Sequence, residues 1–115
     1  MEELKEHLLF KKPWGEFERF TLNEISTVKI LRVNVNQELS LQYHHNRDEF
    51  WQVISGTCNI KISDNITKAK AGDRFFIPKL TLHQIISITD CQILEISFGE
   101  FDEKDIVRVK DKYNR

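Results

Sequence analysis

The sequence predicts an all-β domain from three features: segments with apolar residues at every second position, turn-forming residues between them, and ordinary globular composition. Leu31, Val33 and Val35, for example, share one face of a strand while polar residues share the other. The expected strands cover residues 31–35, 39–44, 49–55, 57–63, 73–78, 83–88 and 91–98. Connections this short favour antiparallel neighbours in a sandwich or barrel.

Residues between the predicted strands tolerate positive φ or hydrogen-bond to their own backbone. They are Asn36, Ser55-Gly56, Ser63-Asp64-Asn65, Ala71-Gly72 and Thr89-Asp90. The two chain ends lack the alternating pattern of the predicted strands. Residues 2–9 place Leu4 and Leu8 four positions apart after two acidic residues, which predicts one short N-terminal helix. Residues 102–115 are mostly charged, and we expect a surface arm or a lid there.

Length and charge limit the possible functions. A chain of 115 residues predicts a single domain, 1–115. Its 17 Lys and Arg against 18 Asp and Glu provide no excess positive charge for a phosphate backbone, which argues against nucleic acid as a partner. No apolar run is long enough for a membrane span or a signal peptide, so we expect a cytoplasmic protein.

Two further expectations concern thiols and assembly. Cys58 and Cys91 form no CxxC pair, and we expect both to be buried free thiols. A small open barrel leaves strand edges that a second copy can cover, so we expect a homodimer.

Four polar side chains form the candidate metal site. Gln42 and His44 point to one strand face, and Glu49 can return to that face after a tight turn, whereas His45 has the opposite parity. His83 begins a later strand. One amide oxygen, two imidazoles and a carboxylate suit a single divalent ion such as Zn, Co, Mn, Ni or Fe, with zinc favoured and a position open for substrate.

The spacing of these residues resembles the two motifs of the cupin superfamily. The first motif reads Gln42-x-His44-x4-Glu49-x6-Gly56 here, and the second reads Gly72-x5-Pro78-x4-His83. The stretch LSLQYHHNRDEFW is similar to LSLQxHHHRxEHW of type II phosphomannose isomerases. Further similar segments are KPWG at 12–15, FIP at 76–78, and the tail pattern DI-x-R with D-x-Y from 105 to 113.

The resemblance, which spans about residues 12–115, implies a cupin fold: a double-stranded β-helix, or jelly-roll barrel. It implies the same four metal ligands and the interconversion of mannose 6-phosphate and fructose 6-phosphate. The sequence departs from the motifs at several positions: Leu80, Asn36 and Asn114 replace glycine, Ser87 replaces asparagine, and Asn46 and Phe50 replace histidine. Asparagine enters the left-handed region readily, whereas Leu80 and Phe50, beside the expected site, could change the substrate.

Such an isomerase needs a group to move a proton and a cation to hold the phosphate. Glu95 is the candidate base, because it lies on a strand face otherwise expected in core or cavity; it either pairs with a buried base or faces the substrate. Arg47 is a candidate for both catalysis and phosphate binding, with Lys79 and Arg74 as further phosphate ligands.

Three alternatives stay open on the same barrel. They are a non-catalytic sugar-binding or sugar-sensing cupin, a cupin acting on another sugar or nucleotide-sugar, and a 2-His-carboxylate oxygenase.

Overall fold

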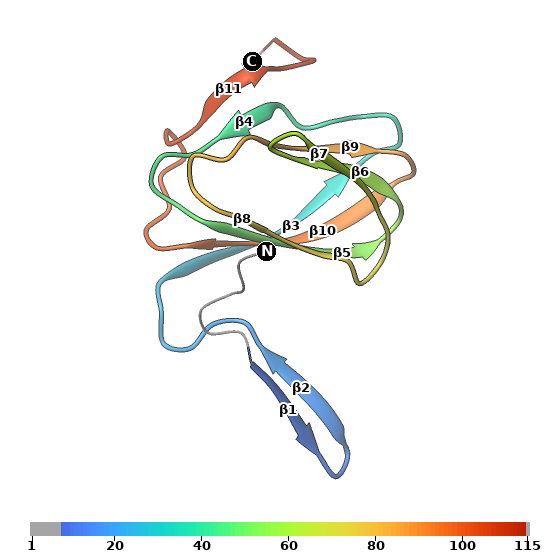
Figure 1. The fold of residues 1–115 in the computed structure, drawn as a ribbon, viewed down its shortest axis with the longest axis vertical. Helices are drawn as coiled ribbons and strands as arrows, with labels where there is room; N and C mark the ends of the chain where they lie inside the picture. The colour runs from blue at the N-terminus through green and yellow to red at the C-terminus, as the bar shows by residue number, and fades with distance from the viewer. Residues whose placement is uncertain (1–7, 115) are drawn as a thin grey trace.

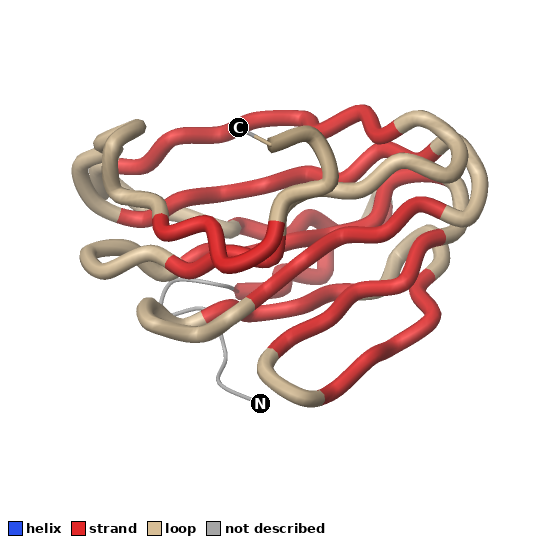
Figure 2. Tube along the Cα trace, turned by 90° about the horizontal axis from the view of Figure 1, so that it is seen from above, coloured by secondary structure: helices blue, strands red, loops and turns tan. Residues whose placement is uncertain are grey.

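The computed structural model describes residues 8–114, which form eleven strands and no helix (Figures 1 and 2). The strands are β1 (Leu8–Lys12), β2 (Gly15–Arg19), β3 (Ser26–Val33), β4 (Leu41–Tyr43), β5 (Glu49–Ser55), β6 (Cys58–Ile62), β7 (Asn65–Ala69), β8 (Arg74–Ile77), β9 (His83–Ser87), β10 (Cys91–Phe98) and β11 (Val107–Lys110). The predicted all-β class is therefore confirmed. No helix within residues 8–114 is long and apolar enough to cross a membrane.

Two antiparallel sheets face each other and enclose the core (Figure 1). The four-stranded sheet has the order β3-β10-β5-β8, and the five-stranded sheet has the order β11-β4-β9-β6-β7. Buried apolar residues from both sheets fill the space between them, including Trp51, Val53, Ile60, Ile85 and Ile93. Cys58 and Cys91 belong to this core and are free thiols, as expected.

Strand register places inward-facing residues in two rows that cross the barrel. In an antiparallel pair, directly opposite residues share a face. The Glu95 row crosses β3, β10, β5 and β8 through Lys29, Glu95, Trp51 and Phe75. The Gln42 row crosses β11, β4, β9 and β6 through Arg108, Gln42, His83 and Ile62. The rings of Trp51 and His83 meet edge to face with centroids 5.3 Å apart, so the rows meet inside the barrel.

The strand predictions hold best in two strands that are buried at more than half of their positions. Residues 49–55 and 91–98 form β5 and β10 with the predicted bounds.

The predicted helix is wrong at Leu8 and Leu9, which begin β1; the rest of that prediction lies outside the described residues. The pairing of β1 with β2 outweighs the weak helical spacing, and it stacks Phe10 on Phe17 with ring centroids 4.9 Å apart.

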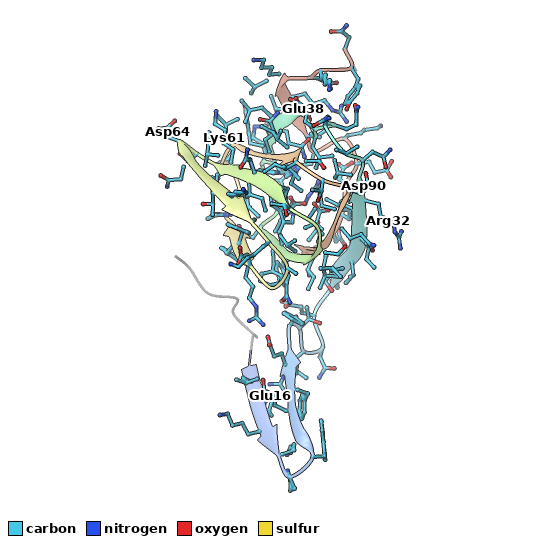
Figure 3. The ribbon with its side chains drawn as sticks, turned by 90° about the vertical axis from the view of Figure 1, so that its right-hand side faces the viewer. Glu16, Arg32, Glu38, Lys61, Asp64 and Asp90 are labelled. Carbon is cyan, nitrogen blue, oxygen red and sulfur yellow. The ribbon has the colours of Figure 1, made fainter. Side chains whose placement is uncertain are left out.

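The β1–β2 hairpin extends away from the barrel (Figures 1 and 3). Its turn exposes 72% of Trp14, which stacks on Phe17. At the other end of the hairpin, Glu18 forms an ion pair with Arg74 on β8. The hairpin is therefore anchored to the barrel edge.

Three non-glycine residues adopt positive φ where the resembled family has glycine. The φ angles are 61° at Asn36, 66° at Leu80 and 56° at Asn114. The two asparagines tolerate this conformation, as the sequence predicts. Leu80 adopts the positive φ despite its larger side chain, which is exposed.

Gly56 packs more closely than any side chain would allow. A Cβ at Gly56 would lie 2.1 Å from the carbonyl oxygen of Asp90, whereas one at Gly72 would meet nothing within 4 Å. Both residues have positive φ, so alanine costs about 1–2 kcal/mol in conformation at either site. We expect Gly56→Ala to lower the free energy of unfolding by about 2 kcal/mol more than Gly72→Ala, because of overpacking. Urea denaturation of both variants tests this, and equal losses would contradict it.

Candidate metal centre

Three buried side chains converge inside the barrel from separate parts of the chain. His44 follows β4, Glu49 begins β5 and His83 begins β9. Their possible ligand atoms all lie within 4.8 Å of one another. Glu49 Oε1 lies 3.5 Å from His44 Nε2 and 3.4 Å from His83 Nε2. The three side chains are between 1% and 2% exposed, so the centre is screened from water.

Backbone carbonyls fix the orientation of both imidazoles. His44 Nδ1 donates to the carbonyl oxygen of Asp105 at 2.6 Å, and His83 Nδ1 donates to that of Thr81 at 2.9 Å. A carbonyl only accepts, so Nδ1 carries the proton in each neutral ring. The lone pair of each Nε2 is then directed to the centre, which is the tautomer a metal needs.

Two buried atoms of the centre have no hydrogen-bond partner among the described residues. They are Glu49 Oε1 and His83 Nε2. Leaving a buried carboxylate oxygen unpaired costs about 1–3 kcal/mol or more. A cation between these atoms would satisfy both, and imidazole nitrogen with carboxylate oxygen suits a divalent transition metal. The residues present therefore fit a metal ion.

Gln42 lies beside the centre with its amide nitrogen directed inward. Gln42 Nε2 is 3.4 Å from His44 Nε2, while Gln42 Oε1 accepts a hydrogen bond from Ser40 Oγ at 2.5 Å. The amide would have to turn over to offer its oxygen as a ligand. Coordination by Gln42 thus stays a prediction, although its side chain is in reach of the centre.

Arg47 is the charge partner of Glu49. Its Nε donates to Glu49 Oε2 at 3.1 Å, and Ser97 Oγ donates to the same oxygen at 2.9 Å. The other guanidinium nitrogens of Arg47 contact the carbonyl oxygen of Asp102 at 3.1 Å and His44 Nε2 at 3.3 Å. Burial disfavours the charge on Glu49, but the neighbouring His44 and His83 outweigh this effect and lower the pKa of the Glu49 carboxyl. Glu49 is therefore an anion and a strong ligand for a metal cation.

The C-terminal segment is part of the centre's wall. β11 pairs with β4, and the Asp105 carboxylate accepts hydrogen bonds from the backbone nitrogens of His45 and Asn46 at 2.8 and 2.9 Å. These two bonds lower the pKa of Asp105 against the opposing effect of burial. Residues 102–110 thus hold the turn that carries His44, a role the charged sequence did not reveal.

A cavity of about 350 Å³ lies at this edge of the barrel. Its walls come from both sheets and from the β10–β11 loop: Lys29, Leu31, Leu39, Gln42, Arg47, Glu95, Phe101, Glu103, Ile106 and Arg108. Lys29, Phe101 and Arg108 are residues that sequence reasoning missed. Only the register across β3–β10 and β11–β4 could have indicated Lys29 and Arg108.

Glu95 is a buried acid held at the cavity wall. It is 7% exposed, and its Oε2 accepts a hydrogen bond from Trp51 Nε1 at 3.0 Å. Burial and the negative charge of Glu49 raise its pKa, and the contributions of Trp51, Lys29 and Arg47 offset this only in part. Glu95 thus lines the cavity, and among the described residues its carboxylate accepts a hydrogen bond from Trp51 and forms no ion pair with a buried base.

Other residues singled out in the sequence lie elsewhere. Arg74 pairs with Glu18 and lines a second cavity with Phe75 and Phe76. Lys79 is exposed, and its backbone nitrogen donates to Asp48 Oδ1. Phe50 packs with Ile96 in a cluster on the opposite strand face from Glu49, so it does not reshape the centre.

The fold and the centre together define a cupin with a candidate metal site. Oxalate decarboxylase from Bacillus subtilis superposes with a TM-score of 0.68 at 20% identity, over 75% of this chain and 24% of that chain. This similarity concerns the fold alone. The family model described as "Mannose-6-phosphate isomerase C-terminal" matches residues 1–111. The chain therefore belongs to the mannose-6-phosphate isomerase C-terminal family.

Two curated relatives are much longer than this chain. Mannose-1-phosphate guanylyltransferase 2 of Escherichia coli is 32% identical over 105 residues, covering 89% of this chain and 22% of that protein. Alginate biosynthesis protein AlgA of Pseudomonas putida is 31% identical over 116 residues, covering 98% and 24%. The chain thus spans less than a quarter of the length of these relatives.

His83 and His45 form a matched pair for testing the centre. We expect His83→Ala to weaken zinc binding by more than about 100-fold, since losing even an outer hydrogen-bond partner of a ligand costs 10–100-fold. His45→Ala should leave zinc affinity almost unchanged, because His45 is exposed and turned away. Competition with a zinc-chelating dye measures both. Equal losses in the two variants would contradict the assignment.

The raised pKa of Glu95 predicts a pH-dependent stability difference. Glu95→Gln keeps an acceptor for Trp51 and removes the ionisable group. Because folding raises the pKa of Glu95, its neutral form is favoured in the folded state, and the penalty appears as pH rises above the ordinary value of 4.5. In metal-free protein, we expect the variant to become increasingly more stable than wild type as the pH rises above 4.5. Urea unfolding tests this; a pH-independent difference would contradict it.

Proposed function

We propose that this protein is a metal-dependent sugar-phosphate isomerase that interconverts mannose 6-phosphate and fructose 6-phosphate. Membership of the mannose-6-phosphate isomerase C-terminal family supports the reaction. The single observation that carries the proposal is the cavity wall shared by Glu95, Arg47 and Gln42 beside the His44–Glu49–His83 centre. An acid and a cation thus line one cavity, and Arg47 and Gln42 in its wall contact residues of the metal centre.

His44, Glu49 and His83 would hold the ion, with Gln42 as a fourth ligand and zinc as the favoured metal. When bound, a divalent ion supplies Lewis acidity, which stabilises negative charge on a substrate oxygen. The screened centre keeps water from competing for that position.

Glu95 is the residue best placed to move the proton between adjacent substrate carbons. A general base works best when its pKa lies near the operating pH, and burial together with Glu49 shifts Glu95 in that direction. The hydrogen bond from Trp51 fixes one carboxylate oxygen, so the carboxyl is held in a single orientation. Glu95 therefore takes the proton from one carbon and returns it to the next.

In this proposal, Arg47 holds the metal-ligand residues Glu49 and His44 in place. Its three hydrogen bonds, to Glu49, Asp102 and His44, hold the guanidinium against the ligand residues. Its Cζ also lies 4.4 Å from the ring centroid of Phe101. Arg47 thus stabilises the Glu49 carboxylate and contributes positive potential to the cavity.

The test is a coupled assay of mannose 6-phosphate isomerisation. Turnover should disappear on chelation and return with zinc. Glu95→Gln should lower kcat by about 100-fold or more, the usual contribution of a general base, without a loss of stability at neutral pH. Lys68→Met, on exposed strand β7, is the matched control and should leave kcat unchanged.

Two outcomes would contradict the proposal. Turnover that persists in Glu95→Gln would show that Glu95 is not the general base. Saturable sugar-phosphate binding by zinc-loaded wild type without turnover would identify a sugar-binding protein.

A further inference from the structure

The two inward-facing rows both end in a cation at the same open edge of the barrel. Lys29 ends the Glu95 row on edge strand β3, and Arg108 ends the Gln42 row on edge strand β11. Both line the 350 Å³ cavity, and both are exposed. Each is the cross-strand neighbour of an inner residue, Lys29 of Glu95 and Arg108 of Gln42. The register therefore places one positive charge on each wall of the entrance.

These two cations are available to a ligand, in contrast to the others near the site. Neither forms an ion pair with a carboxylate among residues 8–114. Arg47 already donates to Glu49 and Asp102, and Arg74 pairs with Glu18. Lys29 Nζ lies 4.0 Å from the ring centroid of Phe101, a contact that orients the ammonium without neutralising its charge.

We propose that Lys29 and Arg108 bind the phosphate of a sugar phosphate at the cavity entrance, one from each sheet. A phosphomonoester carries nearly two negative charges, and a planar guanidinium binds its oxygens bidentately. Glu103 also lines this cavity, so two cations are needed for a net attraction there. The sugar then extends inward along the rows to Glu95 and Gln42. This assignment rests on the proposed function, and it replaces Lys79 and Arg74 as phosphate ligands.

The test measures binding instead of turnover. The probe is a hexitol 6-phosphate, which has no carbonyl to isomerise, titrated calorimetrically into zinc-loaded protein. Lys29→Met and Arg108→Met should each weaken its binding by about tenfold, since a hydrogen bond to a charged group is worth at least that much. Binding of the unphosphorylated hexitol and the zinc content should not change.

Arg32→Met is the matched control. Arg32 lies on the same strand as Lys29, on the opposite face, and its side chain points away from the barrel (Figure 3). The Arg32→Met variant should bind the hexitol phosphate with the affinity of the wild-type protein. Equal weakening by Arg32→Met would show only a general charge effect and would overturn the proposal.

The outcomes separate this inference from the isomerase proposal. If both entrance variants lose hexitol phosphate binding while wild type shows no isomerase turnover, the phosphate site is supported. The proposed isomerase reaction is then contradicted. If the variants bind like wild type, or if wild type does not bind the hexitol phosphate, the inference is overturned whatever the turnover.

Discussion

The buried carboxylate of Glu49 is the group on which the rest of the centre depends. At 1% exposure it cannot be solvated, and its charge needs partners from the protein or a metal. One oxygen is satisfied by Arg47 and Ser97, and the other faces two imidazole nitrogens. The strands and turns that supply these partners are therefore held in one arrangement.

That arrangement is produced by antiparallel register. A slip of one residue would turn every side chain of a strand to the opposite face. Glu49 pairs with Ser97 and Ile77, which keeps its neighbour Phe50 in the outer cluster and Glu49 inside. The alternation that builds the apolar core thus also places the acid at the centre, so the fold and the site share one constraint.

The sequence predicted what depends on local alternation. β5 and β10 were predicted with correct bounds, and the common orientation of Gln42 and His44 follows from the alternation of side chains along an extended chain. β7 was missed because four of its five residues are exposed and it offers no apolar alternation. β11 was missed because three of its four residues are exposed and its charged sequence is typical of a surface segment.

The cavity walls could not be predicted in this way. Lys29 and Glu95 are 66 positions apart in sequence, as are Gln42 and Arg108, and only strand pairing makes them neighbours. Asp105 orients His44 through a backbone carbonyl, which carries no signal in residue type. The sequence therefore indicated the ligands of the centre but not the groups that support them or the entrance to the cavity.

Anomalous diffraction from zinc-loaded crystals would locate the ion. We expect one ion per chain, bonded to the Nε2 atoms of His44 and His83 and to Oε1 of Glu49. An ion held by the thiols of Cys58 and Cys91, or one that leaves Glu49 uncoordinated, would contradict this expectation.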